Sequence, residues 1–90
     1  MRVLSSSSVN KKMQNKEFDF SEVEINNYPF FNCSALKGKV NFNSSVLKSC
    51  DFRGLYLNKC IFKNTVFINC NFTLTNFFMC SFINCKFIEC

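Results

Sequence analysis

The chain has 90 residues, of which 11 are basic and 6 acidic, giving a formal charge of +5. This length allows one small domain, and a hydrophobic fraction of 48% excludes a disordered or collagen-like chain. Because the chain contains no His, histidine-based acid–base catalysis and zinc sites built from Cys and His are also excluded.

Residues 1–16 are polar and rich in Ser, Asn and Lys, which predicts a flexible leader. Residues 17–39 carry apolar residues at a spacing of about five, with one-residue slips near Pro29 and Gly38. The apolar positions are Phe20, Ile25, Phe31 and Leu36. This segment is therefore predicted to be an irregular or degenerate first coil.

Residues 40–90 repeat every five residues, and the central residue of each block is always Phe or Leu. A period of five would leave half of these side chains in water on an α-helix or on a straight strand. If the chain turns a corner within every block, all of them can point inward. The predicted core residues are Phe42, Leu47, Phe52, Leu57, Phe62, Phe67, Phe72, Phe77, Phe82 and Phe87.

The residue two places before each central residue is small or apolar, and it shares the inward direction because strand side chains alternate. Five cysteines complete the predicted core at this inner slot: Cys50, Cys60, Cys70, Cys80 and Cys85. Their spacing in multiples of five does not fit a structural zinc site, and stacked side chains suit disulfides poorly. We expect reduced, buried thiols in a cytoplasmic protein, consistent with an odd total of seven cysteines.

The triplets Cys50-Asp51-Phe52 and Cys70-Asn71-Phe72 have a small residue, then Asp or Asn, then Phe. In this respect residues 40–90 resemble the pentapeptide-repeat family. The resemblance implies an all-β fold, a right-handed quadrilateral β-helix with four repeats per coil. The second position of the repeat departs from the family pattern at Val46, Tyr56, Ile61, Val66, Ser81 and Lys86, which predicts an outer surface individual to this protein.

Little in the repeat suggests chemistry. Its only carboxylates are Asp51 and Glu89, and it has no Gly-rich phosphate loop, so we expect no catalytic residue, no cofactor and no metal. Outward apolar residues predict a protein partner surface, although strands also favour such residues for their own sake. The candidate surface residues are Val46, Val66, Ile68, Phe78, Ile83 and Ile88.

The leading hypothesis is a non-catalytic protein–protein interaction or scaffold module. One version is a bacterial effector whose leader is an export address, and another is a piece of a longer repeat protein. The resemblance also implies an alternative, a DNA-mimicking protein that protects gyrase from quinolones. Residues 40–90 carry five basic and two acidic side chains, which disfavours a mimic of a polyanion.

No further partner class is favoured by the sequence. Direct nucleic-acid binding is disfavoured because the positive charges form no run, and neither a signal peptide nor a membrane span is predicted. The predicted last coil has an open edge, and open edges are normally covered. A homo-oligomer joined around Phe82, Phe87 and Ile88 is therefore a further expectation.

Overall fold

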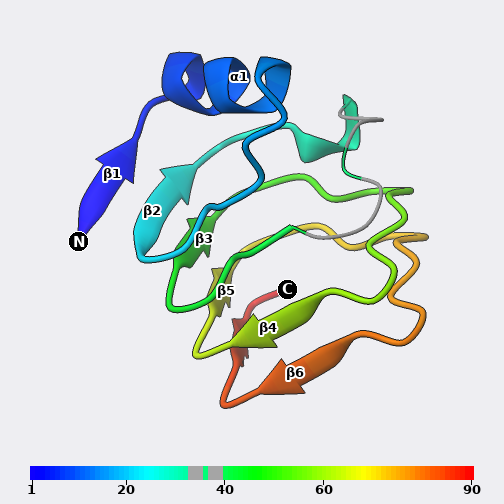
Figure 1. Cartoon of the computed structure of the whole chain (residues 1–90). Coiled ribbons are helices and arrows are strands. Elements are labelled where there is room, and N and C mark those ends of the chain that lie inside the picture. The colour runs from blue at the N-terminus through cyan, green and yellow to red at the C-terminus, as the bar shows by residue number, and fades with distance from the viewer. Residues whose placement is uncertain (33–35, 37–39) are drawn as a thin grey trace.

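The computed structural model describes residues 1–32, 36 and 40–90 (Figure 1). It contains one α-helix, one short 3-10 helix and seven short strands among these residues. In chain order they are β1 (Arg2–Leu4), α1 (Ser6–Gln14), β2 (Val23–Asn26), η1 (Phe30–Asn32), β3 (Val46–Lys48), β4 (Ile61–Lys63), β5 (Val66–Ile68), β6 (Ser81–Ile83) and β7 (Lys86–Ile88).

The strands form two parallel sheets. The larger sheet has five strands in the order β1-β2-β3-β5-β7, and the smaller sheet pairs β4 with β6. Within the repeat, paired residues have the same separation in sequence throughout: Leu47 pairs with Phe67, and Phe62 pairs with Phe82. Between β2 and β3 the offset is slightly longer, and Ile25 pairs with Leu47. Successive turns of the chain therefore lie one above the other, as Figure 1 shows.

The predicted fold class is wrong. The structure is not an all-β quadrilateral β-helix, because it contains α1 and its regular strands form only two parallel sheets, of five and two strands. Five strands of the repeat begin at residues that depart from the family pattern: Val46, Ile61, Val66, Ser81 and Lys86. Elsewhere single bridges link adjacent turns, such as Asp51 with Asn71 and Tyr56 with Asn76.

Repeats with Asp or Asn at the second position form no regular strand, because these side chains compete with the sheet for main-chain hydrogen bonds. Oδ1 of Asn71 accepts a hydrogen bond from the main-chain N–H of Thr73 at 3.0 Å, and Asn76 and Phe78 repeat this arrangement at 2.9 Å. Each contact turns the chain immediately after its bridge. Five of the six departures from the family pattern, taken from the sequence as surface detail, thus mark where strands form, and the sixth, Tyr56, forms a single bridge.

Residues 1–16, expected to be a flexible leader, instead form β1 and α1. The side chain of Ser5 caps α1 by accepting a hydrogen bond from the N–H of Ser8 at 3.1 Å. Val9 of α1 is fully buried, and Leu4 pairs with Ile25 at the edge of the larger sheet. The N-terminal segment therefore lies over one end of the stacked turns (Figure 1).

Residues 17–39, expected to be irregular, contain β2 and η1. Here Phe30 is buried and stacks on Phe52 with ring centroids 5.0 Å apart. Phe31, which the spacing placed inside, is exposed and lies under the guanidinium of Arg53. Cys33 falls outside the described residues.

Stacked phenylalanine rings fill the centre of the molecule. One column joins Phe20, Phe42, Phe62 and Phe82, with centroids 5.6, 6.0 and 4.8 Å apart. The rings of neighbouring columns meet edge to face, as between Phe42 and Phe52. Six of the predicted central residues are fully buried: Phe42, Leu47, Phe52, Leu57, Phe62 and Phe67. The remaining four, Phe72, Phe77, Phe82 and Phe87, lie in the last turn and are only partly covered.

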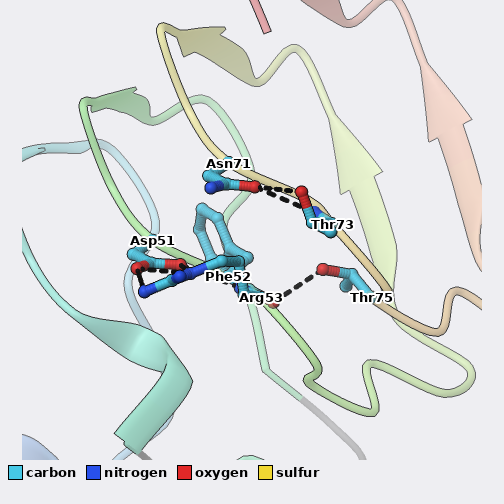
Figure 2. A network of polar contacts seen from close by, with 6 residues as sticks. All are labelled: Asp51, Phe52, Arg53, Asn71, Thr73 and Thr75. Atoms are coloured by element: carbon cyan, nitrogen blue, oxygen red, sulfur yellow. Dashed lines mark hydrogen bonds and ion pairs between the residues drawn. The ribbon is translucent and has the colours of Figure 1, made fainter.

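Side chains at the inner slot donate hydrogen bonds to main-chain carbonyls that face the core. Thr75 Oγ1 donates to the carbonyl of Phe52 at 2.6 Å, and Figure 2 shows this contact. Cys70 and Cys85 donate through Sγ to the carbonyls of Leu47 and Phe62 at 3.2 and 3.1 Å. In each case the acceptor belongs to the turn below. A small side chain with a donor suits this slot because it adds a hydrogen bond to a covered carbonyl, and the carbonyl of Phe52 accepts a second one from the N–H of Leu55 at 3.3 Å.

Two threonines of the same segment test this account, since Thr75 points inward and Thr73 outward (Figure 2). Thr75→Val keeps the shape but removes the donor to Phe52, and we expect it to lower the free energy of unfolding by about 1 kcal/mol. Thr73→Val removes only an exposed contact with Asn71, so its effect should stay below about 0.5 kcal/mol. Chemical denaturation measures both, and equal effects would contradict the proposed role of the slot.

Candidate interaction surfaces

The structure separates the six predicted surface residues into three places. Val46 and Val66 are direct partners on the outer face of β3 and β5, where both are half-buried. Ile68 pairs with Ile88 on the same face. Ile83 lies on β6 of the other sheet, and Phe78 belongs to the connection between β5 and β6. They do not form one surface.

The last turn of the chain, residues 71–90, presents partly covered core residues. Phe82 and Phe87 are 38% and 48% exposed, although the rings equivalent to them one turn earlier are buried. Their strands, β6 and β7, are edge strands at the same end of their sheets. Beside them a hollow of about 620 Å³ is lined by Asn69, Cys70, Asn71, Phe72, Thr73, Phe87 and Cys90.

The backbone turns at a positive φ every five residues from Ser44 to Glu89. Such angles suit Gly, and they are tolerated by Asn far better than by branched or bulky residues. Gly54 and three asparagines, Asn64, Asn69 and Asn84, follow this preference. Leu74 and Met79 do not, because they hold φ angles of 59° and 58° with large apolar side chains.

These two corners border an exposed apolar surface. Leu74 is 88% exposed, Met79 66%, Phe78 between them 63%, and Tyr56 in the turn below 61%. We call Tyr56, Leu74, Phe78 and Met79 the 56–79 face. Of these four, only Phe78 is among the candidate surface residues, although the sequence also predicts that Leu74 and Met79 project outward from the last repeats. For Leu74 and Met79 the signal is an apolar residue at a corner position that elsewhere carries a polar residue or Gly. Tyr56 lies instead at the second position of its repeat, where it departs from the Asp or Asn of the family pattern.

Polar contacts near this region hold the backbone. Arg53 binds Asp51 through its Nη2 atom at 2.7 Å and also donates to Asp51 from Nε and from its main-chain N–H (Figure 2). These contacts, led by the side-chain hydrogen bond, hold the pKa of the Asp51 carboxyl below its usual value. The pair is neutral overall and fixes the turn after Phe52, so we assign it a structural role.

The thiols of the inner slot differ in acidity: the pKa values of Cys60 and Cys70 are raised, whereas the hydrogen bond with Cys70 lowers the pKa of Cys50. No disulfide joins the six cysteines that the structure describes, and burial raises the pKa of the Cys60 thiol. The hydrogen bond with Cys50, together with burial, raises the pKa of Cys70. Thiols with raised pKa values stay protonated and are poor nucleophiles and metal ligands. Cys50, Cys60 and Cys70 are buried, whereas Cys80 and Cys85 are partly covered.

Two further kinds of site are absent from the described residues. No group of three or more Cys, Asp or Glu there could hold a metal ion. A membrane-spanning helix is not found among residues 1–32, 36 and 40–90 either.

The strained corner gives a direct stability prediction. Leu74→Asn should raise the free energy of unfolding by about 0.5–1 kcal/mol, because Asn tolerates a positive φ and the exposed Leu side chain packs against little. Asn64→Leu places a leucine at an equivalent corner and should lower it by a similar amount. Thermal and chemical denaturation measure both variants. A destabilised Leu74→Asn variant would show that this side chain supports the fold.

Comparison with known proteins identifies no relative. No family model, no curated protein and no solved structure matches this chain. Its function is therefore argued from the surfaces described above.

Proposed function

We propose that this chain is a non-catalytic interaction module of the pentapeptide-repeat type that binds proteins through its last turn. The observation that carries the proposal is the end of the two sheets, where β6 and β7 are edge strands beside the half-exposed rings of Phe82 and Phe87. An edge strand presents main-chain donors and acceptors that another extended segment can pair with.

The hydrogen-bond pattern supports this proposal. The N–H of Phe52 donates to the carbonyl of Asn71 at 2.8 Å, and the N–H of Leu57 donates to that of Asn76 at 2.8 Å. The equivalent N–H groups of the last turn, on Phe72 and Phe77, have no acceptor among the described residues. The last turn thus combines open main-chain groups with apolar rings, which gives a partner both hydrogen bonds and buried surface.

Charge disfavours the alternative of a DNA mimic. A mimic needs carboxylates along its surface, but between Asp51 and Glu89 the chain has four basic side chains and no acidic one. Asp51 itself is neutralised by Arg53. No observation favours this second function.

A second copy of the chain is the first partner to test. We expect sedimentation velocity to show self-association that increases between about 1 and 100 µM. The association should be weak because the exposed apolar area of the last turn is small. Replacing both Phe82 and Phe87 by Ser should abolish it, while Phe78→Ser, which leaves the rings of Phe82 and Phe87 and the strands β6 and β7 unchanged, should not. Circular dichroism checks that each variant is folded. A wild-type chain that is monomeric over the whole range would count against the proposal.

A further inference from the structure

We propose that the 56–79 face binds anionic membrane surfaces, a function separate from protein binding through the edge strands β6 and β7. Its four side chains, Tyr56, Leu74, Phe78 and Met79, would enter the boundary between headgroups and acyl chains. The ammonium of Lys59, next to this face, would meet lipid phosphates and carboxylates.

The four side chains belong to one side of the molecule. Tyr56 forms a bridge with Asn76, and the N–H of Lys59 donates to the carbonyl of Phe78 at 2.9 Å, so the two segments run side by side. Figure 1 shows these connections, β3 to β4 and β5 to β6, following the same path. Between the exposed residues, Thr75 and Phe77 are partly covered and pack toward the core. The exposed side chains therefore project away from it.

The exposed area of this face is large for a small chain. Large apolar and aromatic side chains offer about 150–250 Å² each, so the exposed fractions of these four amount to roughly 500 Å². This is near the upper end of the largest patch on a typical soluble monomer. A patch of this size is often functional.

Shape and backbone strain favour a lipid surface. Leu74 and Met79 occupy corners of the chain, and neither lines the hollow beside the last turn. Apolar side chains projecting from corners can enter a bilayer without a matching groove in the partner. At these positive φ angles Asn would be more stable than Leu or Met, so the two apolar side chains run against the local backbone preference.

The charges near the face complement an anionic surface. Lys59 occupies the corner position one turn before Met79. Its ammonium has no ion-pair partner among the described residues. No acidic residue lies between Asp51 and Glu89, and the whole chain carries +5. Basic residues close to an anionic leaflet each contribute about 1 kcal/mol, and Tyr and Phe suit the interfacial region. A nucleic acid would use the charge but not Leu74 or Met79.

Vesicle co-sedimentation tests the proposal. We expect the full chain to bind vesicles of phosphatidylcholine containing about 30% phosphatidylserine, and to bind phosphatidylcholine alone at least about tenfold more weakly. Binding should fall as salt rises from about 0.1 to about 0.5 M, because the electrostatic part is screened. No binding to the anionic vesicles at low salt would overturn the proposal.

Matched variants locate the binding face. Leu74→Asn should weaken binding on the order of tenfold although it stabilises the fold, so that unfolding cannot explain the loss. Lys59→Gln should weaken binding to anionic vesicles by roughly fivefold. Ile68→Asn, on the outer face of β5, should leave it unchanged. Equal binding by the wild type and Leu74→Asn would overturn the assignment to this face.

The same variants distinguish lipid from protein partners. The chain with Phe82 and Phe87 replaced by Ser should lose self-association and keep vesicle binding, because the two surfaces differ. If the wild type ignores vesicles but self-associates in a manner that Leu74→Asn abolishes, the 56–79 face contacts protein and the lipid proposal is wrong.

Discussion

Parallel pairing of equivalent segments in successive turns places Phe62 against Phe82 and Phe67 against Phe87. This register stacks identical ring types, with centroids 4.8 and 4.9 Å apart. It also turns the carbonyls of the central residues toward the core. Thr75 and the slot cysteines donate hydrogen bonds to those carbonyls. One register therefore determines both where the rings stack and where small side chains with donors are placed.

The same register divides the outside of the molecule into surfaces of different character. Where the second position of the repeat is Val, Ile, Ser or Lys, three-residue strands pair in sheets, and where it is Asp or Asn the chain turns after a single bridge. The sheets end at β6 and β7. The turned side carries Leu74 and Met79, whose exposure and positive φ have no structural benefit that we can identify. These two regions carry the functional proposals.

The period of five was enough to predict the buried central residues from Phe42 to Phe67, since only an inward corner keeps Phe42 and Phe52 out of water, but it did not predict that Phe82 and Phe87 are half-exposed. It could not predict the sheets, because strand formation depends on the second position, which varies between blocks. It also missed α1: a short polar segment shows its helix only through the Ser5 cap and the buried Val9. Tyr56 was expected on the outer surface but not assigned to a partner surface, because the sequence does not show which other exposed side chains lie on the same side of the folded chain.

Amide hydrogen exchange, followed residue by residue at a concentration where the chain is monomeric, tests the register most directly. The N–H groups of Phe52 and Leu57, bonded to Asn71 and Asn76 of the next turn, should exchange slowly. Those of Phe72 and Phe77, at the equivalent positions of the last turn, should exchange fast despite a similar local sequence. Equal protection of the two sets, or rapid exchange at Phe52 and Leu57, would contradict this register.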